Sequence, residues 1–197
     1  MTTGHEMTPT LWRTCRVLAN PKRLALIGAL IGKPPQTVGA VAVSCGLSDA
    51  ACSLGLRQIQ ARGLCRATRT GRWVSYALDA DPRVLHAHAL LSVLVPAVKA
   101  CRSNYEPLIA ALTAYTHPRR IDIVATLHRT GPRTPEELGV RCGISLAALY
   151  RHLDKLDRRN VLQQTESSVS LRHPPHPFAR MLLALACDTP DADGITH

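Results

Sequence analysis

The chain contains one stretch of sequence twice, and this internal repeat constrains the fold more than any other feature. When the sequence is shifted by 97 residues, positions 20–64 align without a gap with positions 117–161, and 13 of these 45 pairs are identical. Other pairs are mild exchanges, such as Leu24 for Ile121 and Ile59 for Leu156. A repeat of fixed period indicates copies of one structural module. We therefore predict two similar modules within the 197 residues.

The composition favours closely packed helices and an anionic partner. Aromatic residues are scarce, with one Phe and two Trp, so the core must be built from Leu, Ala, Val and Ile. The formal net charge is +10, and the surplus lies in residues 1–102, which hold 13 Lys and Arg against 4 Asp and Glu. A basic surplus of this kind indicates an anionic partner, with nucleic acid as the first choice.

Helical spacing and capping residues predict four helices at the start of the first module. The expected helices span residues 11–18, 22–31, 38–44 and 49–62. Thr37 and Ser48 are expected to be the N-caps of the third and fourth helices, because their side-chain oxygens can accept a hydrogen bond from a free backbone N–H. The fourth helix is expected to turn Ala51, Leu56 and Ile59 towards the core.

The hydrophobic period then changes from about 3.6 to about 2 residues, which predicts a β-hairpin. Its strands are expected at residues 65–69 and 72–78, with Thr70-Gly71 at the turn. A long apolar helix follows, from Arg83 to about Arg102, with a kink at Pro96. Because this helix is apolar on nearly every side, we expect it to be buried between the modules.

The second copy repeats this order. Thr134 and Glu137 form the pattern of a capping box, Ser145 is the expected N-cap of the fourth helix, and a poorer hairpin is expected at 162–172. A last helix is predicted from Pro177 to about Cys187, followed by a disordered tail at 188–197. The predicted domains are residues 8–102 and 106–187.

Three helices, a capped fourth helix and a two-stranded hairpin make a winged helix-turn-helix. The stretches LANPKRL (18–24), GLS (46–48), RGL (62–64) and TGRWVSYAL (70–78), with Leu56 between them, carry a closer resemblance. Together they resemble the ArsR family of bacterial transcription regulators over about residues 10–102, and more weakly over 108–187. The predicted fold is therefore mainly α with small β-hairpins, built as two tandem winged helix-turn-helix domains.

The resemblance also implies an arrangement and a function. The family usually dimerises through its first and last helices, so a tandem chain is expected to form the two-fold unit within one molecule, as a pseudo-dimer. Whether this pseudo-dimer pairs again as a homodimer is left open. By family analogy, the protein is expected to bind double-stranded DNA as a repressor.

The residues expected to contact DNA differ between the copies. In such a module the fourth helix enters the major groove and the hairpin wing lies along the phosphates. The first copy has a weak reading helix, with Asp49 and Leu54 facing the groove, but an arginine-rich wing. The second copy has Tyr150 and Arg151 on its reading helix, but no basic residue in its hairpin. The predicted DNA-binding residues are Ser48, Ser53, Arg57, Arg66, Arg69 and Arg72 in the first copy, and Ser145, Tyr150, Arg151, His152 and Lys155 in the second.

These differences predict an asymmetric reader that does not use two equal half-sites. Each arginine that neutralises a phosphate releases counterions, so we expect binding that depends strongly on salt. The alternative interpretation of the arginine run is a solvated surface without a partner.

The seven cysteines give no complete site. Residues 38–43 correspond to the stretch that carries the best-known Cys-x-Cys site of the family, and they hold no Cys. Cys15, Cys101 and Cys187 lie on helices expected at the module interface, where a thiol or soft-metal sensor is kept as an alternative. A buried Cys usually packs as a small hydrophobic residue, so we predict no metal site and no cofactor.

Other function classes find little support in the sequence. There is no phosphate loop, nucleophile-base set or pair of carboxylates, so we predict that the protein is not an enzyme. The chain shows no secretory signal and no membrane span, which predicts a reduced, cytoplasmic protein. The remaining alternative is a protein-interaction or antirepressor module whose basic wing meets an acidic partner.

Overall fold

The computed structural model describes residues 10–188, which divide into two compact units. Unit 1 ends at Tyr105, and unit 2 begins at Glu106. The predicted disordered tail lies outside the described residues, apart from Asp188.

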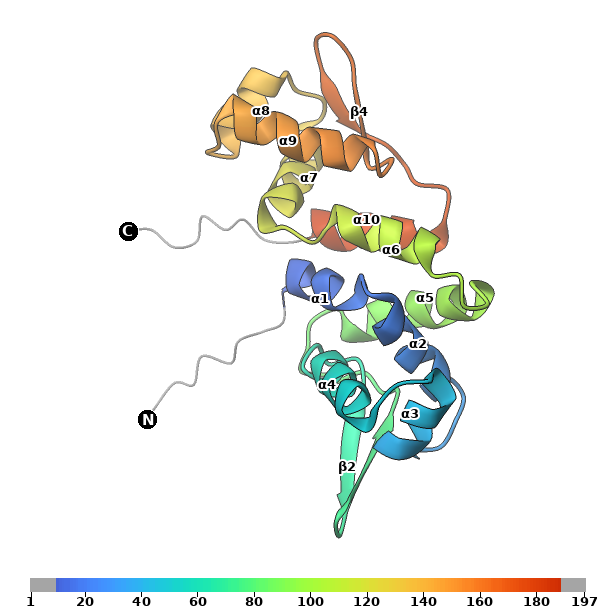
Figure 1. Cartoon of the computed structure of the whole chain (residues 1–197). Coiled ribbons are helices and arrows are strands. Elements are labelled where there is room, and N and C mark those ends of the chain that lie inside the picture. Colours follow the sequence, from blue (N-terminus) through green and yellow to red (C-terminus); the bar gives the residue numbers. More distant parts are fainter. Residues whose placement is uncertain (1–9, 189–197) are drawn as a thin grey trace, which may run out of the picture. The chain divides into compact units, whose positions relative to one another are not determined.

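Unit 1 consists of helices and one small sheet, whose hairpin extends away from the helices (Figure 1). The helices predicted at residues 11–18, 22–31, 38–44 and 49–62 are confirmed, with ends shifted by one or two residues. In chain order, the elements are α1 (Leu11–Leu18), α2 (Pro21–Leu30), β1 (Gln36–Thr37), α3 (Val38–Cys45), α4 (Asp49–Gln60), β2 (Arg66–Thr70), β3 (Trp73–Ala77) and α5 (Ala87–Ala100).

The sheet of unit 1 has three antiparallel strands in the order β1-β3-β2. The predicted hairpin is confirmed, but Thr70 pairs with Trp73, so the two-residue loop is Gly71-Arg72, one position later than predicted. Gly71 takes a φ of 60°, which glycine adopts without strain. The sequence does not predict β1, because two residues are too few to show an alternating pattern.

The core of unit 1 forms where α4 packs against α2. Leu24 of α2 is fully buried, as are Leu56 and Ile59 of α4. Ala51 is exposed, contrary to the prediction, and Cys52 is buried instead. Positions 52, 56 and 59 share one helix face, whereas position 51 points about 100° away from position 52.

Helix α5 begins at Ala87, four residues after the predicted start. The preceding segment forms turns, in which the backbone N–H of Arg83 donates to Asp81 Oδ1 at 3.0 Å and His86 takes a φ of 68°. The helix contains Pro96, as predicted, and packs against α2. Its burial between the modules remains a prediction.

Unit 2 repeats the order of the helices in unit 1, including the last helix after the hairpin. Its elements are α6 (Glu106–Ala114), α7 (Pro118–Thr130), α8 (Pro135–Arg141), α9 (Leu146–Asp157), β4 (Leu162–Gln164), β5 (Val169–Leu171) and α10 (Pro177–Cys187). The second hairpin is confirmed, with shorter strands than the first. Arg133 forms an isolated antiparallel bridge to Val169, at the position 97 residues after Gln36 of β1.

The turn between the third and fourth helices has the same geometry in both units. Gly46 and Gly143 take φ values of 61° and 60°. The hydroxyl groups of Ser48 and Ser145 then accept backbone N–H groups at 3.3 Å, which confirms both predicted caps. The axes of α3 and α4 are bent by 106° at this turn.

No single helix within residues 10–188 is long and apolar enough to span a membrane. Among these residues, only the bent pair of α3 and α4 reaches that length and apolarity when the two helices are taken together.

An arginine ties the first helix of each unit to the second. Arg23 donates through Nη1 to the carbonyl oxygen of Val17 at 2.8 Å. Arg120 donates through Nε to the carbonyl oxygen of Ala114 at 2.6 Å and through Nη2 to Thr116 Oγ1 at 2.7 Å. Arg120 is only 5% exposed and Ala114 is fully buried, so the bond between Arg120 Nε and the carbonyl oxygen of Ala114 is shielded from water.

We expect Arg120→Met to lower the free energy of unfolding by about 2 to 3 kcal/mol, because buried carbonyl groups lose a charged donor. Urea unfolding followed by circular dichroism measures this change. Arg158→Met is the control, since Arg158 forms only an exposed ion pair with Asp154 and should cost less than about 1 kcal/mol. Equal losses in the two variants would contradict the anchoring role.

Candidate nucleic-acid interface

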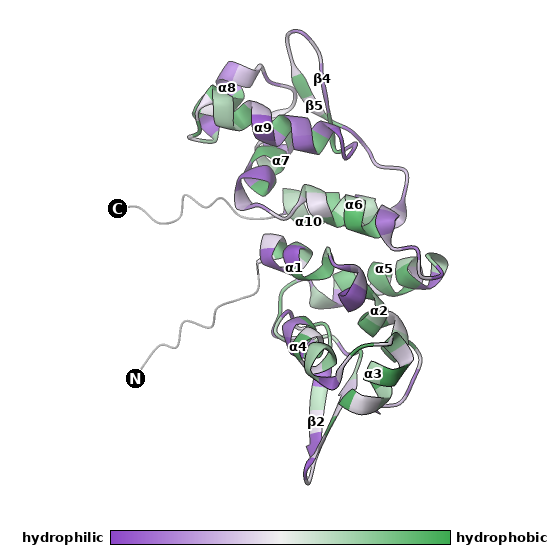
Figure 2. Cartoon of the chain, viewed as in Figure 1, coloured by the Kyte–Doolittle hydropathy of each residue, from purple (hydrophilic) through white to green (hydrophobic). Residues whose placement is uncertain are grey.

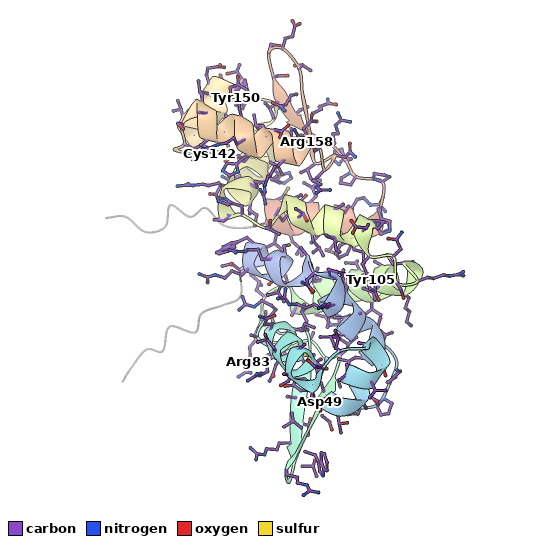
Figure 3. All side chains as sticks on the ribbon, in the orientation of Figure 1. Asp49, Arg83, Tyr105, Cys142, Tyr150 and Arg158 are labelled. Carbon is purple, nitrogen blue, oxygen red and sulfur yellow. The ribbon has the colours of Figure 1, made fainter. Side chains whose placement is uncertain are left out.

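The outer face of α9 in unit 2 carries the best-formed candidate surface. Ser145 caps the helix, and the first two turns place Leu146 and Tyr150 on one side, with 41% and 47% of their surfaces exposed. Tyr150 lies on the outer side of the helix (Figure 3). Residues four apart share a helix face, so these two side chains form one apolar and aromatic strip. Apolar side chains of this kind can contact thymine methyl groups in the major groove.

The charges on α9 are distributed so that the basic residues of its outer face remain available. Asp154 pairs with Arg158 at 3.0 Å, and Asp157 pairs with Arg172 at 3.8 Å. Arg151 and Lys155 are exposed, and neither has a carboxylate within 4.0 Å among the described residues. The two acids of the helix are thus neutralised by other arginines, and Arg151 and Lys155 can meet phosphates or bases.

The structure places His152 apart from this outer face. Its ring packs against His117, the N-cap residue of α7, with 4.7 Å between the ring centroids. Partial burial lowers the pKa of His152, and the nearby His117, Arg120, Arg151 and Lys155 lower it further. His152 is therefore a neutral packing residue at neutral pH, which makes it a poorer phosphate ligand than its two basic neighbours.

The corresponding helix of unit 1, α4, offers weaker chemistry for nucleic-acid binding. Ser48 is engaged as the cap, and Ser53 is half-buried. Asp49 is exposed in the first turn, and Leu54 is 53% exposed. An exposed carboxylate repels phosphates, and a leucine has no donor for a base edge.

The wing of unit 1 concentrates basic residues near its tip. Arg69 donates through Nε to the carbonyl oxygen of Gly71 at 3.0 Å, which holds its side chain beside the loop. The guanidinium carbon of Arg72 lies 5.0 Å from the ring centroid of Trp73, which is 60% exposed. Figure 2 shows hydrophilic residues along the outer part of this hairpin. The tip therefore presents two cations and an aromatic face together.

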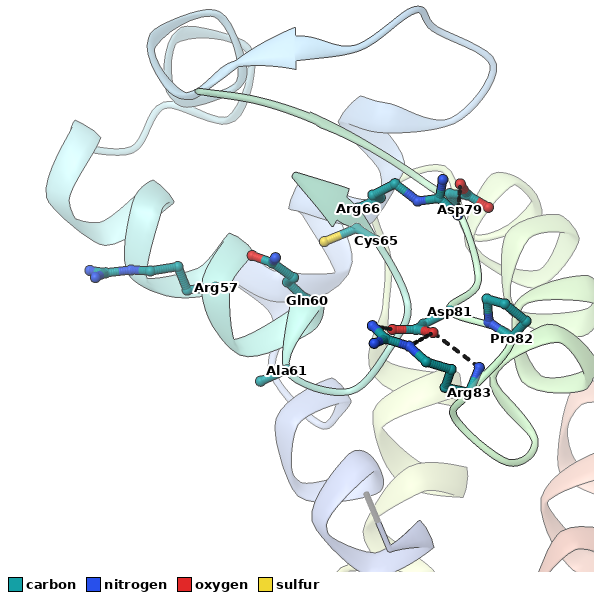
Figure 4. A pocket seen from close by; sticks show the side chains of 9 residues that line it. All are labelled: Arg57, Gln60, Ala61, Cys65, Arg66, Asp79, Asp81, Pro82 and Arg83. Carbon is teal, nitrogen blue, oxygen red and sulfur yellow. Dashed lines mark hydrogen bonds and ion pairs between the residues drawn. The ribbon is translucent and has the colours of Figure 1, made fainter. Parts of the chain in front are cut away.

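The two remaining arginines of the predicted set lie near the base of the hairpin, around an open pocket of about 720 Å³ (Figure 4). Arg66 forms an ion pair with Asp79 at 2.9 Å. Arg57 donates through Nε to the carbonyl oxygen of Ser53 at 3.4 Å. The sequence places no acid between residues 57 and 72, but folding brings Asp79 to Arg66, so part of the expected charge is already neutralised.

The wing of unit 2 is polar but not basic. Thr165 and Ser168 close its loop through hydrogen bonds of 2.8 to 3.2 Å. Arg172 follows the second strand and donates back through Nε to the carbonyl oxygen of Leu162 at 3.0 Å. This arginine stabilises the base of the hairpin.

The cysteines kept as an alternative sensor have protonated thiols. Burial raises the pKa of Cys15 and Cys101, and burial together with Asp188 raises that of Cys187 to about 11. A thiolate is the species that binds metal or reacts, so these thiols are poorly activated. Between residues 10 and 188, no group of three or more His, Cys, Asp or Glu side chains could hold a metal ion.

The sequence-based set omits two exposed residues that share these surfaces, Leu146 on α9 and Trp73 on the wing. Both lie on elements that the sequence predicts, the fourth helix of the second copy and the hairpin of the first. Their exposed fractions, 41% for Leu146 and 60% for Trp73, are known only from the folded structure.

We expect His152 to make unit 2 less stable as pH falls. Its pKa is lowered in the folded protein from the usual 6.5, so below about pH 6.5 the unfolded chain takes up a proton that the folded chain resists. The loss of unfolding free energy between about pH 7.5 and about pH 5.5 should be smaller in His152→Gln than in the unaltered protein. His128→Gln, at an exposed position of the same unit, serves as the control and should retain the full loss.

A comparison with protein families finds a match in unit 2, which carries the candidate DNA-binding face of α9. A family model described as a helix-turn-helix domain matches residues 115–165, from the end of α6 through β4. The match falls on unit 2, whereas the stronger resemblance by sequence motifs falls on residues 10–102. No curated protein matches the chain significantly. The chain thus contains a helix-turn-helix domain, which supports a DNA-binding regulator.

Proposed function

We propose that this protein is a transcription regulator of the ArsR type, built from two winged helix-turn-helix modules, that binds double-stranded DNA as a repressor. The observation that carries the proposal is the outer face of α9, where Tyr150, Arg151 and Lys155 are exposed beside a regular helix-turn-helix turn. This face lies within the helix-turn-helix match. Its donors suit base edges and phosphates in a major groove.

The two modules contribute different chemistry to binding. In unit 2, α9 supplies donors for base edges, while its wing carries no basic residue in its strands or loop. In unit 1, the wing tip supplies Arg69 and Arg72 for phosphates, while α4 exposes Asp49 and Leu54. The operator should therefore lack two equal half-sites.

The proposal includes an intramolecular pseudo-dimer and excludes catalysis. Both units have a helix before the three-helix core and a helix after the hairpin, which are the elements that the ArsR resemblance uses for pairing. α10 packs on α6 and α7 in unit 2, and α5 packs on α2 in unit 1. The chain would then bind DNA without catalysing a reaction, and it would do so in the cytoplasm.

Arg151→Ala should weaken binding of a duplex selected from a random pool by about 1 to 3 kcal/mol, because a bidentate contact to a base is lost. Fluorescence anisotropy with the full chain measures the affinity. Arg158→Ala removes the same charge from the C-cap of the same helix, but Arg158 is paired with Asp154, so we expect a small effect. A larger loss in the control would exclude α9 as the reading helix.

Removing Arg69 and Arg72 together should flatten the salt dependence of binding. If each arginine neutralises one phosphate, the slope of log K against log salt should fall by about 1.8. The double variant Arg66→Ala/Asp79→Ala removes an ion pair without changing the net charge and should leave the slope unaltered. A slope that is unchanged in the first variant rules out wing contacts with phosphates.

One observation favours a second candidate function. Leu54 is 53% exposed on the same helix as the exposed Asp49, and a helix with these two residues is better suited to a protein than to DNA. If the full chain binds no duplex even at low salt, a protein-interaction or antirepressor role replaces the first proposal.

A further inference from the structure

Unit 1 contains a second pocket, with a volume of about 470 Å³, between α2, the end of α3 and the end of α5. Small-molecule sites commonly occupy about 300 to 1,000 Å³. Helix α2 contributes only small side chains to the lining, Ala25, Gly28 and Ala29, and Val98 of α5 adds a larger apolar surface. The pocket thus has room for an apolar group.

Three cations line this pocket without any acid. Lys33 follows α2, Lys99 and Arg102 lie three residues apart at the end of α5, and no Asp or Glu is among the lining residues. None of the three has a carboxylate within 4.0 Å in the part of the chain that the structure describes. Converging cations raise the local concentration of anions.

The first pocket, near the wing, differs from the second because acidic side chains of the chain itself pair with its arginines. There, Asp79 pairs with Arg66 at 2.9 Å, and Asp81 pairs with Arg83 at 2.8 Å (Figure 4). Two of its arginines are satisfied by the chain itself. In the second pocket the positive charge has no such internal partner, and an external anion would supply one.

Hydroxyl donors complete the lining. Tyr105, Ser44 and Ser103 all border the pocket, but Ser44 already donates its hydroxyl to the carbonyl oxygen of Ala40 at 2.9 Å. Burial is the main cause that raises the pKa of Tyr105. Tyr105 therefore remains a hydrogen-bond donor at neutral pH. A side chain on Gly28 would place its Cβ 3.3 Å from Tyr105 Oη, so the glycine allows the tyrosine to lie close to α2.

The segment that carries Arg102 has an unusual backbone. Arg102 and Ser103 take φ values of 43° and 78°, in the left-handed region that side-chain-bearing residues seldom adopt. Both residues line the pocket, as does Tyr105. The same segment leads into unit 2, while Cys45 of the lining directly precedes the Gly46 turn of the helix-turn-helix.

We propose that this pocket binds a small organic anion, a carboxylate or phosphate group on an apolar body, and that the ligand is an effector of DNA binding. Lys33, Lys99 and Arg102 would meet the anionic group, the hydroxyl of Tyr105 would donate to it, and the alanines and Val98 would contact the apolar body. The effector role rests on the proposed function, whereas binding of the ligand does not.

Isothermal titration calorimetry of the full chain with benzoate, phenyl phosphate and neutral benzamide tests the site. We expect binding of at least one of the two anions and no binding of the amide, and the comparison of benzoate with phenyl phosphate identifies the anionic group. Lys33→Gln/Lys99→Gln should weaken binding about tenfold or more, because two charge-assisted contacts are lost. Ala29→Leu should weaken it by filling the pocket without changing the charge.

The charge-matched control is Lys22→Gln/Arg141→Gln, which removes two exposed cations outside the pocket and should retain the affinity. Thermal unfolding of every variant checks that each is folded. Absence of anion binding in the unaltered protein, or an equal loss in the control, would overturn the proposed site.

Duplex binding with and without the anion tests the effector role. We expect the anion to change the affinity of the unaltered protein about threefold or more and to leave the Lys33→Gln/Lys99→Gln variant unaffected. An unchanged affinity overturns the effector role and leaves the ligand site standing. If no duplex binds while calorimetry detects the anion, the proposed DNA-binding function fails and the ligand site stands.

Without ligand, the pocket variant should bind DNA as tightly as the charge-matched control. A selective loss would assign Lys33 and Lys99 to DNA phosphates and overturn the proposal.

Discussion

The presentation of the candidate DNA-binding side chains on the two reading helices depends on the turn that joins the third and fourth helices. Glycine supplies the left-handed conformation at Gly46 and Gly143, and the hydroxyl of a serine two residues later accepts one of the free N–H groups of the next helix. In unit 1 the two helix axes differ by 106° at this turn. One face of the fourth helix then packs on the core, and the opposite face is left for a partner.

The same scaffold carries different electrostatics in the two units. In unit 2, Asp154 pairs with Arg158 and Asp157 pairs with Arg172, so Arg151 and Lys155 stay available. In unit 1, Asp79 neutralises Arg66. The cations that remain available lie at the wing tip and around the second pocket. Which cations remain unpaired decides where an anion can bind. Some of the ion pairs are local, such as Asp154 with Arg158, and others join different elements, such as Arg66 with Asp79.

Much of the fold can be predicted because its signals are local. The caps at Thr37, Ser48, Thr134 and Ser145, the glycines of the turns and the change of period at the hairpin all act within a few residues. The failures have equally clear reasons. Strand β1 is too short to show a pattern, and the start of α5 is set by the turn that Arg83 and Asp81 form. Ala51 is exposed because Cys52 takes the core face.

The sequence by itself determined the repeat, the order of the elements, the helix-turn-helix and the residues near its reading helices, because periodicity, capping and spacing act along the chain. Only the tertiary structure decided which of those residues are available. It packed His152 against His117, paired Arg66 with Asp79, and gathered Lys33, Lys99 and Arg102 around one pocket. These outcomes depend on contacts between segments far apart in sequence, and no local pattern encodes such contacts.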